Sequence, residues 1–302
     1  MFKLAYLTDP HLAPLPEPSC RELASKRLLG YLNWRLFRNK IHDRSVLEAL
    51  VDDIHGQSPN HIAVGGDIAN LSLAREFSQG LQWLQTLGSP EQVSLVPGNH
   101  DAYVSLSWDK GMGLWRDYMS SDADGTPGPG QNKTFPWVRV RGPIALTGLS
   151  SAVPKPPGFA SGEVGEAQLD ALRSILRRLK RADKFRVVMV HHPPLVAMSD
   201  PRRGLDDAEL LQETLRVEGA ELILFGHRHF HSVDELIAED STIPVVGAPS
   251  ASSVKFLPGF LARYALFHIS RKNKRWTCDL VWRGLKEPGG PIVEIDRAPL
   301  MG

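Results

Sequence analysis

Short apolar, β-branched runs recur along the first 250 residues, and each run ends in polar residues. This pattern predicts buried strands. The expected strands span residues 2–9, 61–67, 93–98, 144–151, 186–192, 222–227 and 243–248. Apolar residues at helical spacing lie between several of them and predict helices at 43–56, 73–87 and 165–182. The repeated order of strand, helix and strand indicates a layered α/β architecture.

The last third of the chain has a different pattern. Residues 263–270 and 276–283 alternate apolar and polar positions, which predicts antiparallel strands joined by a basic turn. We therefore expect two sheets that pack face to face. The length is compatible with one domain over residues 1–302. Two segments rich in turn residues, 120–136 and 153–165, predict irregular loops that border a substrate cleft.

Composition narrows the classes of function. The formal net charge is +1, with 35 basic and 34 acidic residues, so no strong overall field would capture nucleic acid or an anionic membrane. The two cysteines, Cys20 and Cys278, are far apart and predict neither a disulfide framework nor a thiolate zinc site. The N-terminal apolar stretch is too short for a signal peptide, and no apolar stretch is long enough to span a membrane. We expect a cytoplasmic protein.

Residues 20–41 form an unusual segment, which we interpret as a basic amphipathic insertion. Six basic residues alternate there with leucines and aromatic residues. If helical, the segment could contact a membrane surface or a lipid-bearing substrate, and the protein would then be peripheral to the inner membrane. The alternative, which we favour from the pattern alone, is a helix that packs its aromatic face on the sheets and leaves its charges in solvent.

Side chains that can bind metal ions follow several of the predicted strands. In Asp9-Pro10-His11, a carboxylate and an imidazole are two residues apart, and an extended backbone would point both to one side. Asp67 follows two glycines at the end of another strand and could bridge two ions. Each motif alone is as compatible with an ordinary turn.

Three further segments add amide and imidazole groups. Asn99 offers a neutral oxygen ligand and stands beside His100, which is free to act as an acid. His191 and His192 end an apolar strand, where neighbours point to opposite sides, so one of them should face the site. Histidines also stand at positions 227, 229 and 231, and imidazole suits zinc, iron or manganese.

Taken together and in this order, the segments resemble the calcineurin-like metallophosphoesterase superfamily. Its pattern of D-x-H, G-D, G-N-H-[D/E], H and G-H-x-H is met between residues 9 and 229. The resemblance implies a four-layer αββα sandwich of two mixed β-sheets flanked by helices. It also implies a centre of two metal ions, manganese, iron or zinc. One ion is assigned to Asp9, His11 and His229, the other to Asn99, His191 and His227, with Asp67 bridging them.

The resemblance also suggests roles outside the ligand set. His191 is preferred to His192 because the histidine of the family commonly precedes x-Pro. His100 is expected to protonate the leaving group or to stabilise the transition state, and Asp101 is expected to orient its imidazole. Arg202 and Arg203, in the loop after His191, are candidates for contact with the phosphate of the substrate.

The substrate is less well defined than the metal centre. Chain length and the His-His-Pro-Pro context resemble the class III cyclic nucleotide phosphodiesterases, so we expect hydrolysis of small phosphodiesters, of the cyclic nucleotide or glycerophosphodiester type. In such enzymes a metal-bridging hydroxide attacks phosphorus in line. The basic aromatic segment 20–41 supports an alternative, a pyrophosphate hydrolase acting on a nucleotide-linked lipid such as UDP-2,3-diacylglucosamine. A nuclease is a third possibility, against which the near-neutral charge argues.

Overall fold

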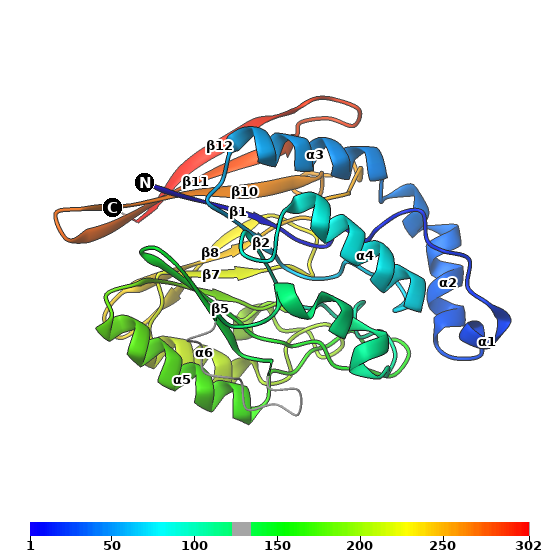
Figure 1. Ribbon diagram of the computed structural model, residues 1–302, viewed down its shortest axis with the longest axis horizontal. Coiled ribbons are helices and arrows are strands. Elements are labelled where there is room, and N and C mark those ends of the chain that lie inside the picture. The colour runs from blue at the N-terminus through cyan, green and yellow to red at the C-terminus, as the bar shows by residue number, and fades with distance from the viewer. Residues whose placement is uncertain (123–133, 302) are drawn as a thin grey trace.

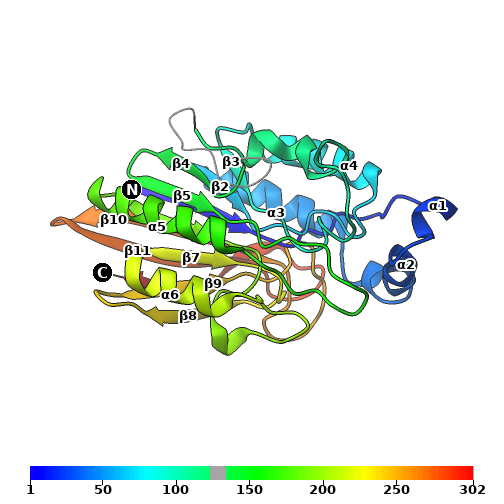
Figure 2. The same ribbon diagram turned by 90° about the horizontal axis from the view of Figure 1, so that it is seen from below.

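Two six-stranded mixed β-sheets face each other, and helices cover their outer faces (Figures 1 and 2). The computed structural model describes residues 1–122 and 134–301. Helices α3 (Arg44–Gln57) and α4 (Ala74–Leu87) cover the first sheet, and α5 (Glu166–Arg181) and α6 (Ala208–Glu218) cover the second. The expected αββα sandwich is thereby confirmed.

The first sheet has the strand order β12-β11-β10-β1-β2-β3. Its strands are β1 (Phe2–Leu7), β2 (His61–Val64), β3 (Val93–Leu95), β10 (Arg263–Lys272), β11 (Arg275–Leu285) and β12 (Ile292–Met301). Strands β1, β2 and β3 are parallel, whereas β10 pairs antiparallel with β1 and continues into an antiparallel meander. The first three strands therefore present their carboxyl ends at one edge.

The second sheet has the order β4-β5-β6-β7-β9-β8. Its strands are β4 (Trp137–Arg141), β5 (Ile144–Gly148), β6 (Phe185–Met189), β7 (Leu222–Phe225), β8 (Ser232–Ile237) and β9 (Thr242–Gly247). The four central strands are parallel, and the two edge strands are antiparallel to them. Because both sheets contain parallel strands, the carboxyl ends of β1 to β3 and of β6 and β7 can converge on one site.

The outer helices form where the sequence predicts them, because each buries an apolar stripe. In α5 the buried side chains recur at helical spacing, and they are Leu169, Leu172, Ile175, Leu176 and Leu179. Helix α3 begins after Asp43, whose carboxylate accepts hydrogen bonds from the backbone N–H groups of Ser45 and Val46. Burial of such stripes is the main source of stability for helices of this length.

The sequence pattern missed three strands and one helix, which are β4, β8, β12 and α6. Strands β8 and β12 lie at sheet edges and expose many of their side chains, so their apolar pattern is weak. The seven strands expected in the first 250 residues are present but end one to three residues earlier than predicted. Their last polar residues belong to the loops that carry the metal-binding side chains.

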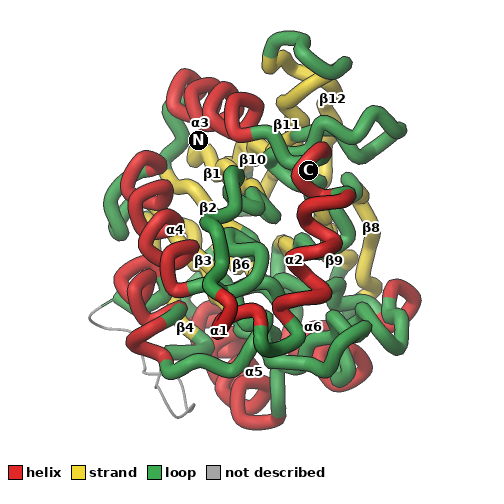
Figure 3. The backbone as a smooth tube through the Cα atoms, turned by 90° about the vertical axis from the view of Figure 1, so that its right-hand side faces the viewer, coloured by secondary structure: helices red, strands yellow, loops and turns green. Residues whose placement is uncertain are grey.

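The segment at residues 20–41 contains α1 (Cys20–Leu23), α2 (Arg27–Leu36) and a short 3₁₀ turn (Arg38–Lys40). It projects at the end of the molecule opposite the chain termini (Figures 1 and 2), and this end faces the viewer in Figure 3. The aromatic Trp34 of α2 is buried, as expected for a helix that packs its aromatic face on the sheets, but the expectation that the charges stay in solvent is wrong for Arg27. Arg27 is buried and donates to the carbonyl oxygens of Leu71 and Ser72, whereas the leucines face solvent.

Only one of the two expected loops lies wholly within the described residues. Residues 153–165 are irregular, and Gly158, Phe159 and Ala160 of this loop line the cavity described below. Most of the expected loop at 120–136, namely residues 123–133, lies outside the described residues. Within the described part of the chain, no helix has both the length and the apolar character needed to cross a membrane.

Candidate metal centre

Seven side chains converge where the parallel strands of the two sheets end. Asp9 and His11 follow β1, Asp67 follows β2, and Asn99 follows β3. From the second sheet, His191 follows β6, and His227 and His229 follow β7. The structure therefore brings together the full ligand set expected from the sequence, from segments up to 220 residues apart.

The backbone at these positions is left-handed, so the expectation of an extended backbone is wrong. Asp9, His11, Asp67, His227 and His229 have φ values of 52°, 39°, 56°, 67° and 52°. Non-glycine residues adopt positive φ rarely, and such residues concentrate at functional sites. The backbone is held there by hydrogen bonds from Asp9 N to Gly66 O (2.9 Å) and from His11 N to Asp67 O (3.1 Å). Tight turns, not an extended strand, thus aim the first carboxylate and imidazole into the site.

Gly98 permits the close approach of two strand ends. A Cβ atom at this position would overlap the Oδ1 atom of Asp67 and would lie 2.6 Å from the backbone nitrogen of Asp67. The absence of a side chain lets the loop after β3 pack directly against the loop after β2. This contact places Asn99 beside Asp67.

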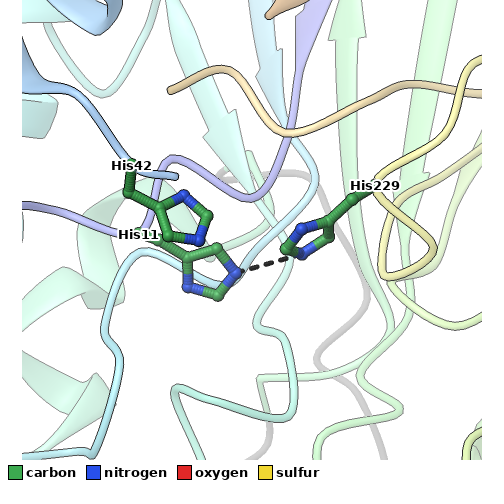
Figure 4. Close-up of side chains that lie close together, drawn as sticks. All are labelled: His11, His42 and His229. Carbon is green, nitrogen blue, oxygen red and sulfur yellow. Dashed lines mark hydrogen bonds between the residues drawn. The ribbon is translucent and has the colours of Figure 1, made fainter. Parts of the chain in front are cut away.

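The first group of possible ligands contains Asp9, His11, Asp67 and His229, whose donor atoms lie within 4.8 Å of one another. The Nε2 atoms of His11 and His229 are 3.1 Å apart, and Figure 4 shows the two rings directed at each other. His229 Nε2 also lies 3.1 Å from Asp9 Oδ1. His11 Nδ1 donates to the carbonyl oxygen of Ala69 (3.3 Å), so its Nε2 lone pair faces this group.

The second group contains Asp67, His191 and His227, with Asn99 between them. His191 Nε2 lies 3.4 Å from Asp67 Oδ2 and 3.2 Å from Asn99 Oδ1. His191 Nδ1 donates to the carbonyl oxygen of Gly65 (2.7 Å), which directs Nε2 into the cluster. His227 Nδ1 lies 2.8 Å from Asn99 Oδ1. Asp67 belongs to both groups and is the residue whose carboxylate could join two ions.

His192 occupies a different environment from its neighbour. Both of its ring nitrogens have partners elsewhere, the hydroxyl of Ser151 at 2.7 Å and the carbonyl oxygen of Ala160 at 3.0 Å. The ring is fully buried, and burial holds the pKa of His192 well below its usual value. His192 therefore ties the end of β6 to the 153–165 loop, and His191 is the histidine that faces the cluster.

The donor set fits a pair of cations. Asp9 Oδ1 is buried and has no hydrogen-bond partner among the described residues, although two imidazole nitrogens point toward the same space. A buried carboxylate oxygen left without a donor is costly unless a positive charge compensates it. Burial lowers the pKa of His191, but Asp67 and Asp9 outweigh burial and raise it to about 10. Mixed imidazole, carboxylate and amide donors suit manganese, iron or zinc.

His100 points into the cavity beside the cluster and contacts Arg38. Its Nδ1 donates to the carbonyl oxygen of Asn70 (2.6 Å), so Nε2 carries the lone pair and accepts from Arg38 Nη1 (2.9 Å). Burial and the neighbouring guanidinium lower the pKa of His100 to about 4. The imidazole is therefore neutral at pH 7, and Nε2 would have to gain a proton before it could donate one.

Asp101 does not orient His100, which corrects the expectation from the sequence. Its carboxylate accepts hydrogen bonds from the backbone N–H groups of Asp67 (2.8 Å), Ala69 (2.8 Å) and Gly98 (2.9 Å). Burial and the nearby Asp67 raise the pKa of Asp101 to about 7. Asp101 thus joins the loops after β2 and β3 and positions Asp67 rather than the imidazole.

Two residues near the cluster, Arg38 and His42, carry no motif, and the sequence pattern did not identify them. Arg38 Nη2 lies 2.8 Å from His11 Nε2 and therefore reaches into the site from the 20–41 segment. His42 lies beside His11 and His229, stacks on Trp34 and contacts the Ser252 hydroxyl at 2.9 Å. Nothing in the local spacing marks these residues, because only the path of the insertion brings them to the site.

The cluster opens into a cavity of about 500 Å³. Basic side chains line it, and they are Arg38, Arg203, Arg228 and Lys255. Aromatic side chains line it too, and they are Trp34, Tyr103, Phe159 and Phe260. Of the two arginines suggested by the sequence, Arg203 reaches the cavity, whereas Arg202 is exposed and is not among its lining residues. Cations and aromatic rings together suit an anionic substrate with an apolar or planar part.

Known proteins resemble this chain in sequence and in fold. A probable cyclic nucleotide phosphodiesterase from Synechococcus sp. (strain WH7803) is 37% identical over 105 residues, which are 33% of this chain and 38% of that protein. The match therefore spans well under half of that relative. A dimetal phosphatase from Danio rerio superposes with a TM-score of 0.65 at 12% identity, over 99% of this chain and 98% of that chain. At such low identity the superposition shows a shared fold.

A second solved structure agrees on the fold. The purple acid phosphatase PPD1 from yellow lupin (Lupinus luteus) superposes with a TM-score of 0.59 at 11% identity, over 99% of this chain and 53% of that chain. The sequence profile of the calcineurin-like phosphoesterases matches residues 2–231, which include all seven converging side chains. The chain therefore belongs to the calcineurin-like phosphoesterase family.

Proposed function

We propose that the protein is a binuclear metal-dependent phosphodiesterase that hydrolyses small phosphodiesters. The observation that carries the proposal is the position of Asp67, which belongs to two adjacent groups of possible ligands at the base of a basic cavity. A carboxylate shared in this way is what a pair of ions requires for joint action on one phosphate.

The ligand roles follow from the two groups. We assign Asp9, His11 and His229 to one ion and Asn99, His191 and His227 to the other, with Asp67 between them. Two ions bound there would activate a water molecule as the nucleophile and stabilise charge on the phosphoryl oxygens. Asp101 and Gly98 hold the loops after β2 and β3 in the relative position that this ligand assignment needs.

Arg38 is the cation best placed to bind a phosphate oxygen of the substrate. Its guanidinium lies between a proposed ligand, His11, and the proposed catalytic residue, His100. A guanidinium can donate two parallel hydrogen bonds to a phosphate. When Arg38 pairs with the substrate, His100 Nε2 loses its positive neighbour and can take up a proton to assist departure of the leaving group.

The preference for a diester rests on similarity and on the cavity lining. The Synechococcus relative is described as a probable cyclic nucleotide phosphodiesterase. Tyr103 and Trp34 offer aromatic surface for the organic group on the far side of the phosphate. A cyclic nucleotide or a glycerophosphodiester would match both features, and a reducing cytoplasm is the compartment that we propose.

Hydrolysis of two chromogenic esters tests the proposal. Enzyme prepared with manganese, iron or zinc is assayed with bis(p-nitrophenyl) phosphate and with p-nitrophenyl phosphate. We expect turnover of the diester to exceed that of the monoester, and activity on the monoester alone would overturn the diesterase assignment. Activity that is insensitive to salt would separate the proposal from a nuclease, because nucleic-acid binding weakens steeply as salt rises.

A second candidate is a pyrophosphate hydrolase acting on a nucleotide-linked lipid such as UDP-2,3-diacylglucosamine. The observation that favours it is the row of exposed leucines on α2, the helix that lines the cavity with Gly30 and Asn33. Acyl chains of a lipid substrate could lie against these side chains. Detergent-sensitive hydrolysis of such a lipid, without turnover of the water-soluble diester, would replace the first proposal with this one.

A further inference from the structure

Several exposed apolar side chains of this protein stand on segments that line the cavity. Five of them stand on or directly after α2, and we call this set the outer α2 stripe: Leu28, Leu29, Leu32, Leu36 and Phe37. Leu29, Leu36 and Phe37 are each about 60% exposed. Such spacing places the leucines on one side of the helix, and a contiguous exposed apolar surface marks an interaction site.

Two other segments add apolar side chains beside the same cavity. Lys255 and Phe260 line the cavity, and the turn between them exposes Phe256 (70%) and Leu257 (49%). Phe159, in the 153–165 loop, lines the cavity and is itself exposed. Three separate parts of the chain that line this cavity therefore each expose apolar side chains.

Contacts on the inner side of α2 fix how the helix is oriented, and this orientation leaves its outer side exposed. Arg27 is buried and donates to the carbonyl oxygens of Leu71 and Ser72 at 2.9 and 2.5 Å. Trp34 is buried and stacks on His42. Turning the leucines inward would leave these polar groups without their partners, which is costly for a buried guanidinium.

Positive charge accompanies the outer α2 stripe. Residues 20–41 contain six basic residues and one acidic residue, whereas the whole chain carries a net charge of only +1. Three of the six, Arg21, Arg35 and Lys40, are exposed. Arg35 and Lys40 are exposed next to the stripe. The charge of this segment is therefore complementary to an anionic surface, and its apolar side chains have the depth to enter the boundary between headgroups and acyl chains.

We infer that the outer α2 stripe docks this protein on an anionic phospholipid bilayer, with the cavity mouth facing the lipid. A bilayer meets both features at once, because it accepts leucines at its acyl boundary and attracts Arg35 and Lys40 at its headgroups. It also accommodates side chains from three segments without requiring a matched shape. The inference does not depend on the proposed reaction, since docking needs no turnover.

Flotation with lipid vesicles tests the inference on the full chain. We expect the protein to float with vesicles of phosphatidylethanolamine and phosphatidylglycerol, and to float much less with phosphatidylcholine alone. Leu29→Gln combined with Leu32→Gln should lower the partition coefficient at least tenfold. Arg35→Gln combined with Lys40→Gln should lower it about fivefold for each charge, and added salt should lower that of the wild type.

Matched controls separate the stripe from general surface effects. Leu210→Gln replaces a leucine of similar exposure on α6, and Arg181→Gln combined with Lys272→Gln removes two exposed charges elsewhere. Neither control should change vesicle binding. Circular dichroism and metal content should match the wild type for every variant, because none of these residues lies in the ligand cluster.

Three results would overturn the inference. The first is the absence of vesicle binding by the wild-type protein at low salt. The second is equal binding by the wild type and the Leu29→Gln, Leu32→Gln variant. The third is a concentration-dependent dimer in analytical ultracentrifugation that the double leucine change abolishes while no vesicles are bound, since the stripe would then face a second copy of the chain. Loss of diesterase activity alone would bear only on the proposed function.

Discussion

The ligand cluster and the 20–41 segment meet in one cavity but are built on opposite principles. The cluster side chains from Asp9, His11, Asp67 and His191 are at most 1% exposed, and they stand on turns directly after sheet strands. The 20–41 segment lies outside the sheets, exposes most of its leucines and reaches the site through one guanidinium. The packed sheets fix the positions of the cluster side chains, whereas the 20–41 segment is attached to the outside of the sheets.

This difference suggests that the two regions have separate tasks, catalysis in the ligand cluster and substrate binding in the 20–41 segment. A metal centre requires donor atoms held within a few tenths of an ångström, and sheet ends with left-handed turns supply such precision. A substrate pocket needs adaptable chemistry, and an attached helix can change its side chains without disturbing the sheets. Changes in the cluster should therefore abolish catalysis, whereas changes in the segment should alter substrate binding.

Asp67→Asn should have the largest effect, because it removes the charge shared by both groups of ligands. Two ions contribute several kcal/mol to transition-state stabilisation, and each 1.4 kcal/mol is tenfold in rate, so kcat/KM should fall by about 10³-fold or more. Metal analysis should find at most one ion per chain. Asp170→Asn on α5 is the control and should leave both values unchanged. Two ions and full activity in Asp67→Asn would show that the carboxylate does not bridge.

His100→Ala should lower kcat while the metal content stays at that of the wild type. The ring of His100 packs edge-on against His11, with 4.9 Å between the ring centroids, but its nitrogens pair with Arg38 and with the carbonyl oxygen of Asn70 and not with a proposed ligand, so its loss should not release an ion. General acid catalysis contributes about 10²–10⁴-fold, and we expect a loss near the lower end. The deficit should shrink for a substrate with a very acidic leaving group. An equal deficit for good and poor leaving groups would contradict the proposed role.

Arg38→Ala tests whether the 20–41 segment binds the phosphate. A charge-assisted hydrogen bond contributes about 1.5–3 kcal/mol, so KM and the inhibition constant of inorganic phosphate should rise roughly tenfold to 100-fold. Arg35→Ala is the control, because Arg35 is exposed and lies outside the cavity lining. If Arg38→Ala instead raises metal affinity with KM unchanged, the guanidinium competes with the ion and does not bind substrate.

The same two regions show what a sequence can predict. The ligands of the cluster could be identified because strand ends and short motifs are local features, and parallel strands must bring them to one edge. Asp101 was assigned wrongly, since its carboxylate turns to three backbone N–H groups that no spacing rule reveals. The burial of Arg27 and the inward path of Arg38 depend on how α2 docks, which is a property of the tertiary structure.

Gly30→Ala should give the smallest effect and isolates the docking of α2. A Cβ atom there would lie 2.5 Å from Leu71 Cδ2 and 2.6 Å from the Tyr103 hydroxyl, so either the helix or these two side chains must shift. Overpacking costs about 1–3 kcal/mol and is partly offset by about 1 kcal/mol of helix propensity. KM should rise a few-fold, whereas kcat and metal content should not change.

Gly56→Ala on α3 is the control, since a Cβ atom there meets no described atom within 4 Å and should only stabilise the helix. A fall in kcat or loss of metal in Gly30→Ala would mean that the position of α2 controls the geometry of the metal ligands. The 20–41 segment would then serve catalysis as well as substrate binding.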